Sequence, residues 1–132
     1  MWNKHINLKD SRKASLKFCE EFYLIYCQVY MVDILPDNTW GNYIYLDPPH
    51  ILILDSYLNI NKLGVLMHEL THHLECQGYD GDYQDKPQHG YHYQLAKKRV
   101  IRWCNKNIST KPDWNKPLCA IYRKDDMKAF KV

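Results

Sequence analysis

The run His68-Glu69-Leu70-Thr71-His72 constrains this chain more than any other sequence feature. An α-helix turns by about 100° per residue, so two histidines four positions apart lie only about 40° apart around its axis. Both imidazoles can then reach one ion. The apolar residues around the run predict a helix that starts with Asn59 or Asn61 as N-cap and continues to about Gln77, with Gly78 as its stop signal. The run therefore predicts a metal site on a helix.

The residue types in this run suit zinc chemistry. Glu69 follows the first histidine and stands about 100° away from it around the helix, too far to act as an equal third ligand. It can instead reach a water on the ion, as in the HExxH pattern. Zinc lowers the pKa of bound water towards 7, so that Glu69 can take a proton while the metal polarises a carbonyl. A surface histidine cluster without metal is the alternative interpretation.

A catalytic zinc needs three protein ligands, so a third must come from elsewhere in the chain. No glutamate follows Glu75, which lies one turn beyond the second histidine but further along the helix axis. His73 points about 140° away from the first histidine and is expected to pack rather than bind metal. His89 and His92 remain. We favour His89, because a returning antiparallel helix would bring its first turn across from the end of the motif helix.

The remaining elements complete an α+β pattern. Residues 9–32 carry apolar side chains at three- and four-residue steps and predict one helix. Two β-type runs follow, at 42–46 and 51–54, and the two consecutive prolines between them exclude one continuous strand. A second helix is predicted for 89–105, because one apolar stripe runs along it: Tyr93, Ala96, Val100 and Trp103 (or Cys104). The expected fold is thus an N-terminal helix, a small mixed β-sheet, the motif helix and a second helix that carries the third ligand, followed by a C-terminal extension at 108–132.

Length and composition limit the class of protein. The 132 residues suffice for a single domain, 1–132, and 45% hydrophobic residues exclude wholesale disorder. The apolar runs are far shorter than the roughly 20 residues of a membrane-spanning helix, and the N-terminus lacks the apolar stretch of a secretory signal. We therefore expect an intracellular, cytoplasmic protein with no membrane partner. The five scattered cysteines are expected to be reduced thiols.

The motif run, together with the block His89-Gly90-Tyr91-His92-Tyr93, resembles the SprT-like metallopeptidases over residues 51–103. In that family the second block typically reads His-Gly-Pro-x-aromatic, and its leading histidine is the third zinc ligand. The resemblance implies that His89 is that ligand, that Tyr93 is the aromatic residue and that the fold is zincin-like. Here Tyr91 replaces the usual proline, which leaves the ligand in place.

The resemblance also implies an activity. It is that of a zinc-dependent metalloendopeptidase with one zinc per chain, held by His68, His72 and His89, with Glu69 as general base and a protein or peptide as substrate. Many members carry a C-terminal zinc ribbon, but this chain has no Cys-x-x-Cys. Action on DNA-associated proteins therefore depends on one basic helical face. Its alternative interpretation is the solvated exterior of a helix. Five residues form this face: Lys97, Lys98, Arg99, Arg102 and Lys106.

Two other classes of function remain open from the sequence. One is a structural or accessory protein, for instance of a virus, that keeps the metal site without turnover. The other is a zinc amidase with a non-protein substrate. For a peptidase, residues 43–45 and 51–53 are the candidate sheet edges for an extended substrate. Three tyrosines are candidates for stabilising an oxyanion, because they lie near the predicted ligands in sequence: Tyr83, Tyr91 and Tyr93.

Overall fold

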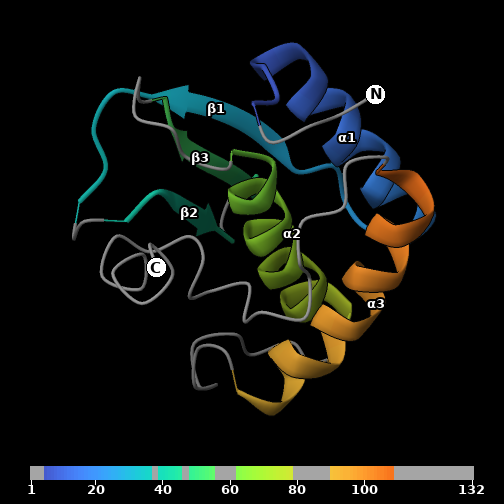
Figure 1. The fold of residues 1–132 in the computed structure, drawn as a ribbon. Helices are drawn as coiled ribbons and strands as arrows, with labels where there is room; N and C mark the ends of the chain where they lie inside the picture. The colour runs from blue at the N-terminus through green and yellow to red at the C-terminus, as the bar shows by residue number, and fades with distance from the viewer. Residues whose placement is uncertain (1–4, 37–38, 46–47, 56–61, 79–89, 109–132) are drawn as a thin grey trace, which may run out of the picture.

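The computed structural model describes residues 5–36, 39–45, 48–55, 62–78 and 90–108. These ranges form an α+β fold, as predicted, with three helices and a three-stranded mixed sheet (Figure 1). None of the helices in the described ranges combines the length and the apolar character needed to cross a membrane. The elements in chain order are α1 (Leu8–Glu21), β1 (Gln28–Val32), β2 (Gly41–Ile44), β3 (His50–Leu54), α2 (Lys62–Gly78) and α3 (Tyr91–Asn107).

The sheet has the strand order β1-β3-β2, with β1 parallel and β2 antiparallel to β3. Val29, Ile51 and Tyr43 lie side by side across the three strands, and all three are buried. They therefore mark the face of the sheet that the helices cover. Because β3 is central, only the first of the two candidate edges, residues 43–45, belongs to an edge strand in the described part of the sheet.

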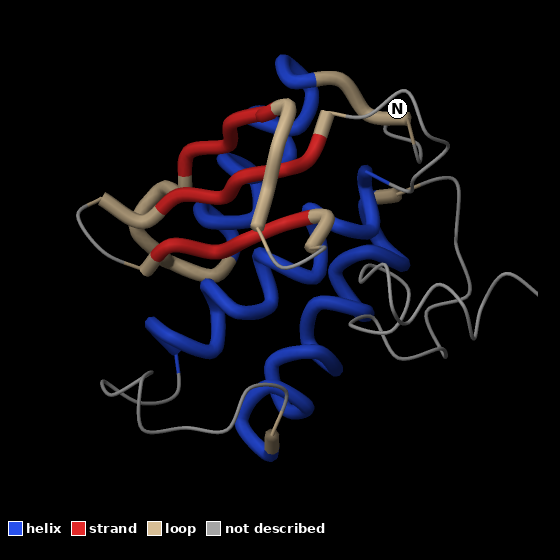
Figure 2. Tube along the Cα trace, turned by 90° about the vertical axis from the view of Figure 1, so that its left-hand side faces the viewer, coloured by secondary structure: helices blue, strands red, loops and turns tan. Residues whose placement is uncertain are grey.

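The helices form layers on one side of this sheet (Figures 1 and 2). Helix α1 packs on β1, α2 packs on β2 and β3, and α3 packs on α2. Trp103 joins α3 to α1, because its ring meets that of Phe18 edge-on at 5.4 Å and its indole N–H donates to Glu21 Oε2. Helix α2 therefore lies between the sheet and α3.

The prediction of one helix over residues 9–32 is wrong, because α1 ends at Glu21. Tyr23 has φ of 56°, and the Leu24 amide donates to the Cys19 carbonyl at 2.8 Å, which closes a Schellman-type helix end. Glycine usually occupies this left-handed position, since other residues are strained there. The tyrosine therefore hides the helix end from sequence inspection.

Strand β1 occupies the second half of that expected helix. Its side chains alternate: Cys27 and Val29 are buried, whereas Tyr26 and Tyr30 are exposed, as suits a half-buried strand. The hydroxyl of Ser15 donates to the Cys27 carbonyl. This hydrogen bond fixes the start of β1 against α1.

The two C-terminal helices agree with prediction to within two residues at each described end. Helix α2 ends at Gly78, and its candidate N-caps, Asn59 and Asn61, lie outside the described residues, as does the expected extension beyond Ile108. Gly90 is the N-cap of α3. The predicted apolar stripe of α3 is confirmed as its buried side: Tyr93, Ala96, Val100, Trp103 and Cys104.

Candidate metal centre

Helix α2 buries polar side chains as well as apolar ones. Every residue from Leu63 to Glu75 is buried, and His68, Glu69, His72 and Glu75 are each only 4–6% exposed. Buried polar and charged groups destabilise a fold unless they have partners. The partners of these four side chains therefore indicate which kind of ligand the helix could bind.

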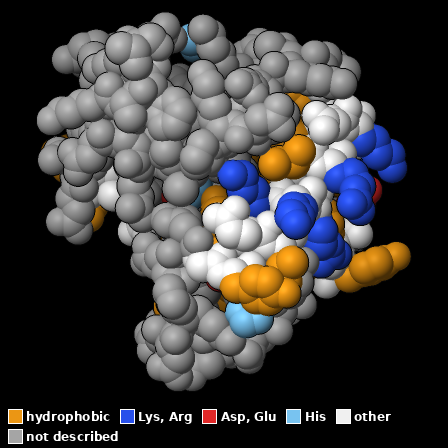
Figure 3. All heavy atoms as spheres, turned by 60° about the horizontal axis from the view of Figure 1, so that its bottom comes forward, with side chains coloured by type: hydrophobic (Ala, Val, Ile, Leu, Met, Phe, Trp, Pro, Cys, Tyr) orange, Lys and Arg blue, Asp and Glu red, His pale blue; other side chains and the backbone are white. Residues whose placement is uncertain are grey.

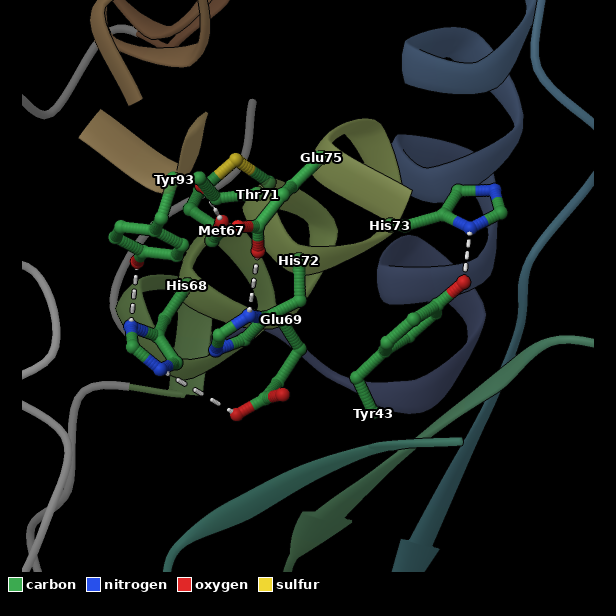
Figure 4. A network of polar contacts seen from close by, with 9 residues as sticks. All are labelled: Tyr43, Met67, His68, Glu69, Thr71, His72, His73, Glu75 and Tyr93. Atoms are coloured by element: carbon green, nitrogen blue, oxygen red, sulfur yellow. Dashed lines mark hydrogen bonds and ion pairs between the residues drawn. The ribbon is translucent and has the colours of Figure 1, made fainter. Parts of the chain in front are cut away.

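His68 and His72 lie side by side, as their spacing predicts. Their ring centroids are 4.9 Å apart, and the ring planes are nearly perpendicular, at 85°. Figure 4 shows both rings on the same side of α2, with the carboxylate of Glu69 below them. The helix thus brings two imidazoles and a carboxylate to one place.

Each of these histidines has its Nδ1 atom next to a polar partner. The Nδ1 atom of His68 is 2.8 Å from the hydroxyl oxygen of Tyr93, and that of His72 is 3.4 Å from Glu75 Oε1. The Nε2 atom of His68 is turned to the other side, 3.8 Å from Glu69 Oε1 (Figure 4). Metal-binding histidines typically donate their second N–H to such a partner, which orients the ring and fixes its tautomer.

Strand β2 runs directly beside Glu69. A Cβ atom added at Gly41 would overlap Val65 Cγ1 and would lie 3.2 Å from Glu69 Cγ and 3.3 Å from Glu69 Oε1. Only a glycine therefore allows the strand to come this close. The Glu69 carboxylate consequently lies between His68 and the edge strand of the sheet.

The charges of the cluster fit a bound cation. Glu75 Oε1 is buried and has no hydrogen-bond partner in the described part of the chain, although His72 Nδ1 is 3.4 Å away. A buried carboxylate is unfavourable without a positive charge nearby. A divalent ion on the Nε2 side of His72 would supply that charge and would strengthen the Nδ1–H group as a donor to Glu75. The residues present therefore fit a metal ion.

The described side chains do not complete a site with three protein ligands. Within the described ranges, no group of three or more His, Cys, Asp or Glu side chains is arranged to hold an ion. His89, the predicted third ligand, lies outside these ranges, immediately before the N-cap Gly90. The other candidate, His92, is half-buried, and its ring contacts that of Tyr91 at 5.6 Å between centroids.

The remaining polar residues of α2 have different surroundings. Glu75, weighed as a ligand, lies beside His72 Nδ1. His73 faces away from the cluster, as expected, with Nδ1 2.7 Å from the Tyr43 hydroxyl and Nε2 2.7 Å from the Ile25 carbonyl oxygen. Burial lowers the pKa of His73, which keeps this imidazole neutral.

Two contacts of the site were missed by sequence reasoning. The hydroxyl of Tyr93, one of the three candidates for stabilising an oxyanion, meets His68, while Tyr91 is 74% exposed and Tyr83 lies outside the described residues. Only the fold could reveal this pairing, since the two residues belong to different helices. The contact of Glu75 with His72 had a signal, because residues three apart on a helix are neighbours.

The cysteines agree with the expectation of reduced thiols. Cys19, Cys27, Cys76 and Cys104 are free, and all except Cys76 are buried. Burial raises the pKa of these thiols, which makes them poor nucleophiles. Cys119 lies outside the described residues.

Comparisons of the chain with protein-family models, with curated proteins and with solved structures found no match. The resemblance to SprT-like metallopeptidases therefore rests on the quoted residues alone and stays a prediction. The structure adds independent geometry, namely the paired rings of His68 and His72 and the partners of their Nδ1 atoms.

Proposed function

We propose that this protein is a zinc-dependent metalloendopeptidase with a zincin-like site of SprT-like type. His68, His72 and His89 would hold one zinc ion per chain, and Glu69 would be the general base. The observation that carries the proposal is the orientation of the two described histidines, whose Nδ1 atoms meet Tyr93 and Glu75. This leaves the opposite edges of the rings on the side of Glu69 (Figure 4).

The chemistry assigned to the chain's own residues is proton transfer. Zinc, when bound, lowers the pKa of water and polarises a carbonyl group. The Glu69 carboxylate is buried and 3.8 Å from His68 Nε2, within reach of a proton on the attacking water. Glu69 would take that proton and pass it to the nitrogen that leaves as the peptide bond breaks.

Helix α3 supports His89 as the third ligand. Tyr93, in the first turn of α3, already reaches His68 on α2. The start of α3 is therefore directed at the two histidines, and His89 precedes its N-cap by one residue. His92 is next to Tyr93 and so projects about 100° away from it around the helix.

A peptide substrate would add to the outer edge of β2. The Leu54 amide donates to the Trp40 carbonyl, so residues 42 and 44 share the next ladder bonds with β3 in this antiparallel register. The main-chain N–H and C=O groups of Gly41 and Tyr43 consequently point away from β3. They present an edge for an extended chain next to Glu69, which is a common mode of peptide recognition.

The outer face of α3 supports an extension of the proposal to proteins bound to DNA. Helix α3 carries five basic residues and no acidic residue. Figure 3 shows basic side chains gathered on one exposed face of the molecule. Within the protein, Arg99 lies over the ring of Phe22 and Lys106 is 3.7 Å from Glu21 Oε1. Phosphate contacts by this face would make any DNA-stimulated cleavage sensitive to salt. Stimulation that persists at high salt would count against them.

Two other proposals compete with the peptidase. A metal-binding accessory protein would keep the same ligands without turnover, and a zinc amidase would act on a non-protein amide. The buried base Glu69, held next to the edge strand by Gly41, favours turnover of an extended peptide. A cytoplasmic location is part of the proposal.

The test combines metal analysis with cleavage of an unfolded protein such as casein. Wild-type protein is expected to contain about one zinc per chain, and His89→Ala to lose most of it. Glu69→Gln is expected to keep the zinc and to lower turnover about 10²- to 10⁴-fold. Full zinc in His89→Ala would reject the third ligand. A wild-type protein that holds zinc but cleaves neither casein nor DNA-bound protein would favour the accessory-protein alternative.

A further inference from the structure

His73 is a buried side chain that the proposed chemistry does not use. It follows the ligand His72 in the chain, is fully buried, and faces the opposite side of α2 (Figure 4). Both of its nitrogens lie 2.7 Å from oxygen atoms of other segments, the Tyr43 hydroxyl and the Ile25 carbonyl. His73 thus joins α2 to β2 and to the segment that precedes β1.

The direction of each hydrogen bond follows from the groups involved. A carbonyl oxygen can only accept, so His73 Nε2–H donates to Ile25, and Nδ1 of the neutral ring accepts from the Tyr43 hydroxyl. The Cys76 thiol also hydrogen-bonds to Tyr43. In addition, Gln77 Oε1 accepts from the Ile25 amide at 3.1 Å. The last turns of α2 therefore hold Ile25 by both of its backbone polar groups and Tyr43 by its side chain.

Tyr43 also belongs to the edge proposed to bind peptide. Its backbone groups point outward from β2, while its side chain reaches back across the sheet face to α2. Two residues earlier, Gly41 lies so close to α2 that an added Cβ atom would be 3.2 Å from Glu69 Cγ. The bond between Tyr43 and His73 therefore fixes the part of β2 that lies next to the general base.

We propose that His73 and Tyr43 are positioning residues. They hold the outer edge of β2 in the position at which a peptide bound to it contacts Glu69. This inference rests on the proposed function, because it requires that peptides bind along β2. An ordinary core pair would be apolar, whereas a fully bonded polar network specifies one arrangement of the segments that it joins. The polar chain from α2 to Tyr43 has that property.

The experiment measures casein binding and casein cleavage separately. Fluorescein-labelled casein is titrated with zinc-loaded protein carrying Glu69→Gln, and KM and kcat are measured with active protein. Tyr43→Phe is expected to raise both Kd and KM about threefold to tenfold, the value of roughly one hydrogen bond, with unchanged zinc content. Tyr26→Phe is the matched control, because it removes only the hydroxyl bond to Gln28 on the exposed side of β1.

A second pair of variants distinguishes the loss of the hydrogen bonds of His73 from a general loss of folding. The glutamine in His73→Gln can still donate to Ile25 and accept from Tyr43, so it is expected to retain Kd and KM, whereas His73→Leu is expected to raise both. Lower thermal stability with unchanged Kd and KM in Tyr43→Phe and His73→Leu would overturn the inference and leave the peptidase intact. Wild type could also bind casein without cleaving it, while Tyr43→Phe binds it more weakly. That result would reject the proposed peptidase activity and would support the positioning role of Tyr43.

Discussion

His72 and His73 are neighbours in the chain, and both are buried, yet they lie in two different surroundings. His72 shares one face of α2 with His68, and its Nδ1 atom meets a carboxylate of the same helix. His73 has both nitrogens in hydrogen bonds to segments outside the helix. His72 belongs to the proposed metal centre, whereas both nitrogens of His73 are already bonded to protein atoms. The difference teaches that the elements packed around a helix, rather than residue type, decide what each histidine does.

The largest expected effect separates the two histidines directly. His72→Ala should weaken zinc binding by roughly a thousandfold, because one of three ligands is lost from a binding free energy on the order of 10 kcal/mol or more. His73→Gln should bind zinc as tightly as wild type. Competition with a chromophoric chelator measures both affinities. Equal losses in the two variants would remove the distinction between the two faces of α2.

The next effect concerns the partner of His72. Glu75→Gln should lower zinc affinity about 10- to 100-fold, because the histidine loses the carboxylate that orients its ring. The same chelator competition measures it, with Glu20→Gln on the exposed side of α1 as control. An unchanged zinc affinity would mean that the contact between Glu75 and His72 has no part in metal binding.

A third change tests the close approach of β2 to Glu69. Gly41→Ala should destabilise the protein by about 1–3 kcal/mol, since the new methyl group overlaps Val65. It should also lower casein turnover, because Glu69 must move. Asn42→Ala changes the opposite face of the same strand and should do neither. Denaturant unfolding and initial rates measure the two properties. A fully stable and active Gly41→Ala protein would show that the strand can move away without loss.

The smallest effect lies at the end of α1, two residues before Ile25, whose carbonyl oxygen is 2.7 Å from His73 Nε2. Tyr23→Gly should be more stable than Tyr23→Ala by about 1 kcal/mol, because only glycine adopts positive φ without strain. Comparing these two variants cancels the loss of the exposed ring. Thermal unfolding measures the difference. Zinc affinity should be the same in both variants, and a change there would link this turn to the metal site.

Sequence reasoning succeeded where a signal was local. The spacing of His68 and His72 fixed their common face, and the apolar stripe of α3 was confirmed. Sequence reasoning failed at β1, because Tyr23 occupies a left-handed position where a glycine would have indicated the end of the helix. Tyr26 and Tyr30 then fitted helical spacing by coincidence, although they alternate with buried residues of a strand.

The non-local part of the site could not be predicted. Tyr93 reaches His68 only because α3 packs against α2, and Tyr43 reaches His73 only because β2 is an edge strand under the same helix. The strand order β1-β3-β2 is likewise set by tertiary packing, since parallel and antiparallel partners of β3 have similar sequence patterns. These contacts depend on relations between elements that spacing along one element does not encode.

The burial of α2 around its whole circumference has a consequence for its amide protons. Between Leu63 and Glu75 the helix is covered on every side, so local opening would expose few of its N–H groups to solvent deuterium. Their slow exchange would report the unfolding of the entire domain. An ion that binds only the folded chain slows that exchange by the factor 1 + c/Kd, where c is the free ion concentration, so these amides would record metal binding without any assay of catalysis.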